Sequence, residues 1–496
     1  MKINSIVLTF VLSFSALFST AQTSKTLKLD LQKVIKMATD SSLTAFRYRN
    51  LYLSSYWSYR QYKAERLPSL SLSINPVTYN RQIVSRYDYE NDRDVFRQQK
   101  SYSASGQLTM SQNFSPLGGT FFAETDLSYL RSFGATTYNQ FSTVPFQIGY
   151  YNSMFGYNEF KWNKKIEPLK YERAKLEYLY NTENIAYVAV NYFFALAQAQ
   201  SQYRNAVEQA AQSDSLLVMG ERRYKIASTT KSDLMSLKLD VVNARNAIIT
   251  AEVQMKRATL DLTSFLGIDS DTQIDLELPG APGDIKIDVQ KAMEMMHKNS
   301  YLILEKMQNV SEAEKALDRV RKSTRFNANV SATVGFNQQN EELSKAYQDP
   351  TRRDVVSVTL SIPLLDWGVG KGQRNYYKNN LNIARIDEQQ KIMELEQNVI
   401  ITISELQSRL NLFASAEEAL ILANEVYKEN VARFRNGTCD ITTLSSSQQR
   451  LQTAQNNYIS SMNQYWQCYY DLRRQTLYDF QFDFSLADEF DFNLLK

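Results

Sequence analysis

Alternating apolar and polar residues mark stretches that the sequence predicts to be β-strands. Residues 69–74 read Ser-Leu-Ser-Leu-Ser-Ile, and residues 327–334 and 354–362 alternate in the same way. A period of two places apolar side chains on one face of a strand and polar side chains on the other. We therefore expect strands whose two faces meet different surroundings.

Long stretches with helical spacing follow these strands. The longest cover residues 167–225 and 374–435, and each is followed by a turn and a return helix, over 232–266 or 441–476. A helix of ~65 residues would be roughly 100 Å long, far more than a compact domain needs. The pattern therefore favours extended helical hairpins.

The order of helix, strands, long helix, turn and helix occurs twice. Residues 31–73 align without a gap with residues 289–331, at an offset of 258. Residues 223–266 align with residues 433–476 at an offset of 210. Ordered recurrence of a whole pattern predicts an internally duplicated architecture. In the first copy the opening helix begins near Asp30, an N-cap residue type, and should run to Arg66.

The offset decreases by 48 within the strand region, so the first half carries extra residues there. Residues 103–114 and 121–130 flank Ser-Pro-Leu-Gly-Gly, which is a turn sequence. We expect an inserted β-hairpin over about 101–133. It could extend the sheet, cover its mouth or plug it.

The return helices carry a seven-residue repeat. Its d positions are apolar through five heptads in both copies: Leu234, Val241, Ile248, Met255 and Leu262 in the first, and Leu444, Leu451, Tyr458, Tyr465 and Leu472 in the second. The a positions are mixed. This repeat predicts coiled-coil packing on one side of each helix, although an ordinary helical bundle would also produce it.

Composition argues against several function classes. Gly (15) and Pro (9) are scarce, which fits long helices. The net charge is only +3 without a basic block, which argues against nucleic acid as a partner. One His and two Cys leave little material for a metal or acid–base site, and no phosphate loop or zinc spacing occurs. We therefore expect no cofactor and no enzyme.

The first 21 residues are typical of a secretory signal. Lys2 precedes a largely apolar stretch, and Ser19-Thr20-Ala21 supplies small residues before the expected cleavage point. No later stretch approaches ~18–20 apolar residues, so we expect no transmembrane helix. The expected organisation is a signal peptide over 1–21, a first repeat over 22–279, a connector over 280–300, a second repeat over 301–476 and a tail over 477–496.

On these residues the chain resembles the TolC-like outer-membrane efflux proteins of Gram-negative bacteria. The resemblance covers essentially residues 25–480. It rests on the duplication, on Ile-Pro-Leu-Leu-Asp-Trp-Gly at 362–368, and on two hairpin turns that follow Arg223-Tyr224 and Arg433-Phe434. The first of these turns spans about 226–232 and the second about 436–441. No single motif is specific, but their order and spacing are.

The resemblance implies a mixed α+β fold and a homotrimer. Each chain would give four strands to one shared 12-stranded transmembrane β-barrel, and its coiled-coil hairpins would form a periplasmic α-barrel. The implied function is an outer-membrane channel-tunnel that conducts substrates from an inner-membrane pump and a periplasmic adaptor. A few strands cannot enclose a pore alone, and open sheet edges are not tolerated in lipid, which agrees with closure by oligomerisation.

The resemblance also implies that the hairpin tips contact the adaptor and close the tunnel. The candidate docking residues are Ile226, Ala227, Ser228, Thr229, Asp233, Asn436, Gly437, Thr438 and Cys439. The candidate constriction residues are Arg223, Arg433, Asp440, Thr443 and Ser446. Some relatives carry aspartates at the positions of Thr443 and Ser446, so a charged gate of that kind is not expected here. Both arginines could instead be simple helix C-caps.

Other functions remain open at this point. The chain could be the outer-membrane duct of a type I protein secretion system. It could also be a periplasmic coiled-coil adaptor or structural protein, although adaptors usually have one helical hairpin between Gly-rich β-domains. A secreted enzyme is disfavoured because no catalytic set of residues is found.

Overall fold

The computed structural model describes residues 26–133, 137–226, 230–280, 283, 285–436 and 438–495, so the expected signal peptide lies outside the described residues. The chain divides into two compact units. The sheet unit comprises Tyr52–Lys175 and Tyr301–Glu394. The helical unit comprises the described residues up to Leu51, Leu176–Ser300 and those from Leu395 onward.

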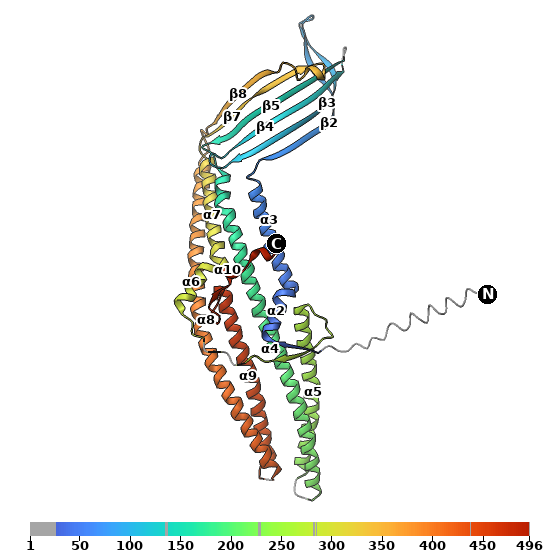
Figure 1. The fold of residues 1–496 in the computed structure, drawn as a ribbon, viewed down its shortest axis with the longest axis vertical. Coiled ribbons are helices and arrows are strands. Elements are labelled where there is room, and N and C mark those ends of the chain that lie inside the picture. Colours follow the sequence, from blue (N-terminus) through green and yellow to red (C-terminus); the bar gives the residue numbers. More distant parts are fainter. Residues whose placement is uncertain are drawn as a thin grey trace, which may run out of the picture. The chain divides into compact units, whose positions relative to one another are not determined.

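The sheet unit contains one antiparallel sheet of six strands (Figure 1). Its strands, in spatial order, are β2 (Ser69–Asp88), β3 (Arg93–Phe114), β4 (Gly119–Phe133), β5 (Tyr138–Met154), β7 (Asn327–Asn340) and β8 (Thr351–Ser361). The strands expected from alternation over 69–74 and 327–334 are confirmed as parts of β2 and β7, and the strand expected over 354–362 is confirmed as part of β8 except for its last residue. The resemblance implied four strands per chain. This number is wrong for this chain, because β3 and β4 are full members of the sheet.

The inserted hairpin accounts for the two additional strands. Expected over about 101–133, it forms β3 and β4 and lies between β2 and β5, so it extends the sheet. β3 begins earlier than expected, at Arg93, because β2 and β3 pair as far as Asp88 opposite Arg93. The pairs of β3 with β4 start only at Lys100, so the ends of β2 and β3 extend past β4.

The opening helix of the first half is interrupted, which corrects the expectation of one helix from Asp30 to Arg66. It forms α2 (Leu31–Ser41) and α3 (Leu43–Ala64). Asp30 caps α2 as expected, because its carboxylate accepts the backbone N–H of Lys33 at 2.8 Å. Ser42 separates the two helices: its backbone is extended, and its hydroxyl accepts the N–H of Ala45 at 3.1 Å. A second N-cap inside the pattern therefore starts a new helix.

The long helices are α4 (Glu159–Lys225) and α8 (Val369–Arg435), of 67 residues each. Both begin before the expected residues 167 and 374. Asn158 caps α4 by accepting the N–H of Lys161 at 3.0 Å. The helix then continues through Pro168, although a proline in a helix removes one backbone hydrogen bond. Sequence reasoning placed the start beside that proline and missed the cap.

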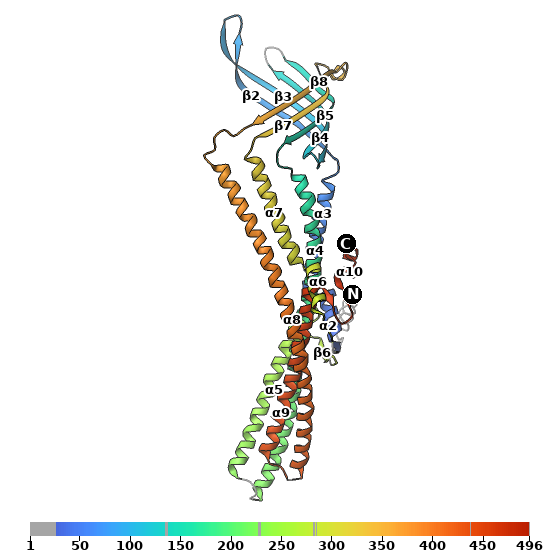
Figure 2. The same ribbon diagram turned by 90° about the vertical axis from the view of Figure 1, so that its left-hand side faces the viewer.

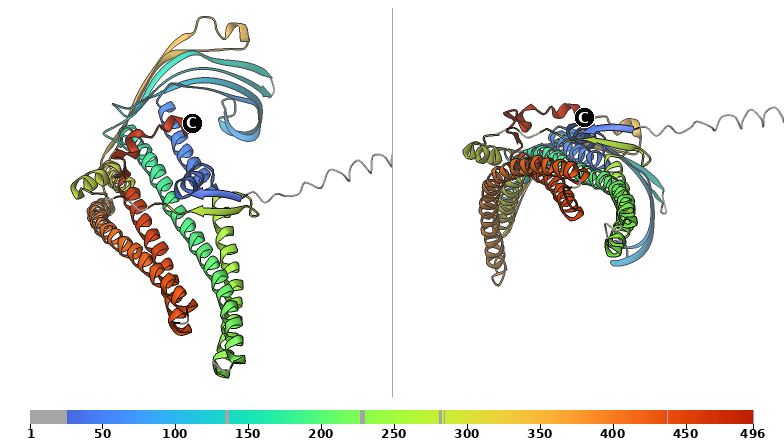
Figure 3. Two further views of the ribbon diagram at one scale, coloured as in Figure 1. Left: turned by 60° about the horizontal axis from the view of Figure 1, so that its bottom comes forward. Right: turned by 90° about the horizontal axis from the view of Figure 1, so that it is seen from below.

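The helical unit contains two hairpins, in which α5 (Lys231–Leu266) follows α4 and α9 (Ile441–Thr476) follows α8 (Figure 2). α2 packs against α5, and α6 (Val289–Asn299) packs against α9. β1 (Thr26–Asp30) pairs in parallel with β6 (Gln273–Glu277), as Figure 3 shows. The sheet unit also includes α7 (Tyr301–Ser323) and η1 (Leu343–Lys345). The chain ends in β9 (Tyr478–Asp479), β10 (Phe484–Ser485), α10 (Leu486–Glu489) and η2 (Phe492–Leu495).

Equivalent elements of the two halves recur at the offsets read from the sequence. α2 and α6 begin 258 residues apart, as do α3 and α7 and β2 and β7. α4 and α8, like α5 and α9, begin 210 residues apart and have equal lengths. The offset changes between β2 and α4, and β3 and β4 lie between those two elements.

The seven-residue repeat identifies the packed side of the return helices. Leu234, Val241 and Leu262 are buried in α5, and Leu444, Tyr465 and Leu472 are buried in α9. The polar a positions of the first copy, among them Lys238 and Arg245, are exposed. The return helix of the first half therefore has one packed and one solvated side. No helix among the described residues is both long and apolar enough to cross a membrane.

Candidate functional site

The first candidate site is the six-stranded sheet, which carries a broad apolar face. Cross-strand partners share a face, so the registers extend this face through all six strands. Its exposed apolar members include Leu70, Leu72, Ile74, Leu108, Met110, Phe121, Phe146, Ile148, Val334, Val356, Val358 and Leu360. Monomeric soluble proteins rarely expose so large an apolar patch. The face therefore requires an apolar partner.

The opposite face of the sheet is polar. Glu124 of β4 lies at its middle, where its carboxylate accepts hydrogen bonds from the amides of Gln107 and Gln147, both at 3.0 Å. These three side chains come from β3, β4 and β5. At one end of the face, the hydroxyls of Ser69 and Ser111 lie 2.8 Å apart. A sheet with one apolar and one polar face suits a boundary between lipid and water.

Exposed apolar residues also gather where the strands meet the helices. Leu364 is 92 % exposed and Trp367 is 88 % exposed, directly after β8. Trp367 has a positive φ of 53° and is followed by Gly368 at 91°. The carboxylate of Asp366 accepts the N–H groups of Gly368 and Gly370, both at 2.9 Å, and so starts α8. Tryptophan at the end of an apolar band is typical of a membrane interface.

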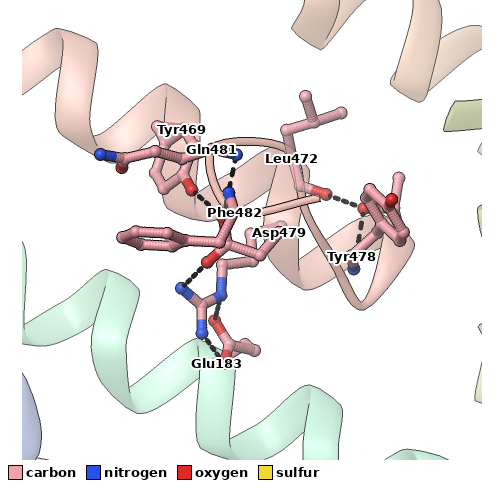
Figure 4. Close-up of polar contacts among 9 residues, drawn as sticks. Glu183, Tyr469, Leu472, Tyr478, Asp479, Gln481 and Phe482 are labelled. Atoms are coloured by element: carbon pink, nitrogen blue, oxygen red, sulfur yellow. Dashed lines mark hydrogen bonds and ion pairs between the residues drawn. The ribbon is translucent and has the colours of Figure 1, made fainter. Parts of the chain in front are cut away.

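A buried charge cluster holds α4, α9 and the C-terminal tail together (Figure 4). The guanidinium of Arg473 lies between two carboxylates, with its Nε 2.9 Å from Glu183 Oε2 and its Nη1 2.6 Å from Asp479 Oδ2. Asp479 also accepts the hydroxyl of Tyr469 at 2.8 Å and the N–H groups of Gln481 and Phe482. These contacts satisfy Asp479, which is only 1 % exposed.

The electrostatics of this cluster depend on its arginine. Burial raises the pKa of Glu183, and the charge of Arg473 opposes this rise. Glu183 precedes Arg473 by 290 residues in the chain. Sequence reasoning missed the cluster because neither residue belongs to a local motif. An acidic residue shortly before the apolar stretch of α4 that begins at Ile185 was the one available signal.

The second candidate site is the pair of hairpin tips. At the tip between α8 and α9, the carbonyl of Arg433 accepts the N–H of Thr438 at 2.9 Å and its hydroxyl at 3.1 Å. Asp440 caps α9 by accepting the N–H of Thr443 at 2.6 Å, and this hydrogen bond lowers the pKa of Asp440. Phe434 and Leu444 are buried beneath the turn.

The tip between α4 and α5 is built differently. Thr230 and Asp233 form a capping box: the Thr230 hydroxyl accepts the N–H of Asp233 at 3.1 Å, and the Asp233 carboxylate accepts the N–H of Thr230 at 3.1 Å. The guanidinium of Arg223 lies 5.9 Å from the ring of Phe434, at the end of α8. Arg223 therefore links the two hairpins of one chain, which a plain helix cap would not do.

The expected tip residues divide into three groups. Ala227, Ser228, Thr229 and Gly437 lie outside the described residues. Ile226, Asp233, Asn436, Thr438, Asp440, Thr443 and Ser446 are exposed at or near the tips, whereas Arg223 and Cys439 are half-buried. Arg433 Nη2 lies 3.5 Å from the carbonyl oxygen of Thr438, within its own turn. Cys439 lies just before α9.

A groove along the helical unit is the third candidate. It has a volume of about 850 Å³ and lies between α4, α5 and α9. Amide side chains line it, and Gln198 of α4 donates to Asn456 of α9 at 2.6 Å. Arg257 and Asp261 of α5 add charge to the groove. Sequence reasoning saw only that these helices have a polar side and did not predict a groove.

Comparisons with known proteins concern the family and the fold of the chain. Residues 296–476 match the family described as outer membrane efflux protein. A comparison with curated proteins finds no match.

Several solved structures share the fold. The CmeC outer membrane channel of Campylobacter jejuni superimposes with a TM-score of 0.65 at 10% identity, over 90% of this chain and 85% of that one. VceC, an outer membrane protein of Vibrio cholerae, superimposes with a TM-score of 0.61 at 13% identity, over 90% of this chain and 95% of that one. The MtrE outer membrane channel of Neisseria gonorrhoeae superimposes with a TM-score of 0.52 at 13% identity, over 90% of this chain and 88% of that one. The resemblance inferred from the sequence is therefore confirmed.

Proposed function

We propose that this chain, which carries an outer membrane efflux protein domain in its second half, is the outer-membrane channel of a tripartite efflux system. Three copies enclose a transmembrane β-barrel and continue into the periplasm as an α-barrel of coiled-coil hairpins. A periplasmic adaptor and an inner-membrane pump supply the substrate, and the chain itself performs no catalysis. The duct of a type I secretion system is the alternative within transport, because the pump selects the substrate.

The two-faced sheet is the observation that carries this proposal. Its apolar face, with Leu72, Leu108 and Val358 exposed, suits lipid, and its polar face around Glu124 suits a water-filled lumen. One chain leaves two open sheet edges, and lipid does not tolerate unpaired backbone groups. Assembly of several copies removes both edges. The recurrence of elements at fixed offsets supports two copies of one unit in each chain, as proposed from the sequence.

Fractionation of cell envelopes tests the proposal. We expect the protein in the outer membrane, where detergent should extract a particle of three times the mass of the chain that remains once the expected signal peptide is removed. The trimer buries the open edges of the sheet, so it should persist in mild detergent. A soluble monomer, or a protein found in the inner membrane, would contradict the channel and favour a periplasmic adaptor or structural protein.

We also propose that the tips dock the adaptor. Ile226 supports this because it is an apolar side chain that is 74% exposed directly after α4. A photoreactive amino acid at position 226 should give an adduct with the adaptor that mass spectrometry identifies. The same probe at Ile249, which is 62 % exposed on α5, should give at least tenfold less adduct. Equal yields at both positions would remove the tip from the docking surface.

The constriction of the tunnel is proposed at the same tips, with Arg223, Arg433, Asp440, Thr443 and Ser446 as its candidates. The contact of Arg223 with Phe434 supports Arg223 first, because it joins two hairpins. Single-channel recording of the reconstituted trimer tests this role. An unchanged closed-state conductance in Arg223→Ala would exclude Arg223 from the constriction.

A further inference from the structure

The strand count of the sheet unit changes the size of the proposed pore. Resting on the homotrimer proposed above, we propose that three copies of this chain close a barrel of 18 strands, because each copy contributes six. In this assembly β8 of each copy pairs with β2 of the next. The partner for each sheet edge is thus a second copy of this chain.

The inserted hairpin has the two faces of a barrel wall. In β3, Leu108 and Met110 are exposed on the apolar face, while Gln107 lies on the polar face and donates to Glu124 of β4. Leu108 is the direct cross-strand partner of Leu72 in β2. A hairpin that plugged or covered a pore would meet water on both faces and would not need this alternation. The pattern therefore places β3 and β4 between lipid and lumen, like the other four strands.

The geometry of the two edges allows closure with neighbouring copies. Every neighbouring pair of strands in the sheet is antiparallel, and the number of strands is even. β2 and β8 therefore run in opposite directions, so β8 of one copy can pair with β2 of the next in the same antiparallel pattern. All residues of β8 and residues 69–83 of β2 are exposed. A head-to-tail contact of this kind closes into a ring when each copy is rotated by a third of a turn from the last, as the proposed trimer requires.

The added strands widen the lumen. The diameter of a barrel grows roughly linearly with its number of strands, so this barrel would be about one and a half times as wide as a 12-stranded one. Barrels of 16–18 strands leave an open aqueous channel even in single-chain porins. The passage through the outer membrane would therefore be wider than in a 12-stranded relative.

Cryo-electron microscopy of the purified trimer in lipid nanodiscs tests this directly. We expect a wall of 18 strands with β3 and β4 in it. A trimer with 12 strands, and with the hairpin inside or outside the wall, would overturn this inference and leave the channel intact. Two copies that close 12 strands would overturn it as well and would also contradict the proposed trimer.

A pair of charged substitutions provides an independent measurement. Leu108→Arg places a charge on the lipid side of β3, and Thr109→Arg places one on the lumen side, next to Glu124 in the register. Val358→Arg places a charge on the lipid side of β8, a strand that does not belong to the inserted hairpin. We expect Leu108→Arg and Val358→Arg to lower the yield of outer-membrane trimer at least tenfold, and Thr109→Arg to leave it within twofold. If Leu108→Arg assembles like Thr109→Arg while Val358→Arg fails, the hairpin is not in the wall.

Discussion

Replacing Arg473 with methionine is expected to destabilise the helical unit by about 3–5 kcal/mol, the usual effect of removing one partner from a buried ion pair. The substitution keeps most of the side-chain volume but leaves Glu183 and Asp479 facing each other without a cation. Asp479 retains Tyr469 and two backbone donors, so most of the loss falls on Glu183. Hydrogen–deuterium exchange of α9 and of the tail would measure the change in the free energy of opening.

The pH dependence of this variant identifies the cause of the loss. Without Arg473 the effect of burial on Glu183 is unopposed, so its pKa in the folded protein should rise further above the ordinary value. The folded state then binds a proton more tightly than the unfolded chain. The loss of stability in Arg473→Met is therefore largest at pH values above the folded-state pKa of Glu183, and it shrinks as the pH falls through that pKa. Arg473→Met combined with Glu183→Gln should recover part of the stability at pH 8.

An exposed ion pair provides the matched control. Arg245 of α5 lies 3.2 Å from Asp214 of α4, and both side chains are more than half exposed. Such pairs contribute only about 0–1 kcal/mol. Arg245→Met should therefore change exchange little at any pH. If Arg473→Met were as stable as Arg245→Met, or if its loss were the same at pH 5 and pH 8, the cluster would not have the role assigned to it.

Replacing Gly335 with valine is expected to prevent proper pairing of β5 with β7. A Cβ atom at Gly335 would lie 2.7 Å from the carbonyl oxygen of Phe146 and 2.8 Å from the Cα of Gln147. Both are backbone atoms that cannot move aside like a side chain. Overpacking usually lowers the free energy of unfolding by about 1–3 kcal/mol. Because the crowded atoms at Gly335 belong to the backbone, we expect a loss at the upper end of this range or above it. We expect roughly tenfold less folded trimer, measured by its heat-sensitive mobility in electrophoresis.

Gly106 is the control for this substitution. It also lies in the sheet, on β3, but a Cβ atom there would have no neighbour within 4 Å. Valine favours strands, so Gly106→Val should assemble at least as well as the unaltered chain. Equal defects in the two variants would point to a general intolerance of the sheet and not to crowding at Gly335.

Local patterns explain which parts of the fold could be predicted from the sequence. The alternation around Leu70 and Leu72 revealed a strand, and Asp30 was recognised as an N-cap because both signals depend on neighbouring residues. The aligned offsets located the elements of the second half. Ser42 was missed because its capping hydrogen bond interrupts a pattern that otherwise continues through it. The strand count was wrong because it came from the resemblance, although the hairpin itself was identified.

The candidate site was predictable only where it depended on sequence position. The tips were located because Arg223 and Arg433 mark equivalent turns, and their roles stay proposals. The contact of Arg223 with Phe434 joins separate hairpins, and the hydrogen bonds of Glu124 join three strands. Such groupings depend on register and packing, which no periodic pattern specifies. The same holds for Glu183 and Arg473.

The position of Asp479 in the chain has a consequence for the order of folding. Glu183 is synthesised long before its partners, and Asp479 belongs to β9, after the last long helix. The buried face of α4 around Glu183 thus carries an unpaired carboxylate until α9 and β9 have been made. Premature packing of α4 is disfavoured during this time, because an isolated buried charge is costly. Burial of this face of α4 therefore depends on α9 and β9 being present to supply Arg473 and Asp479.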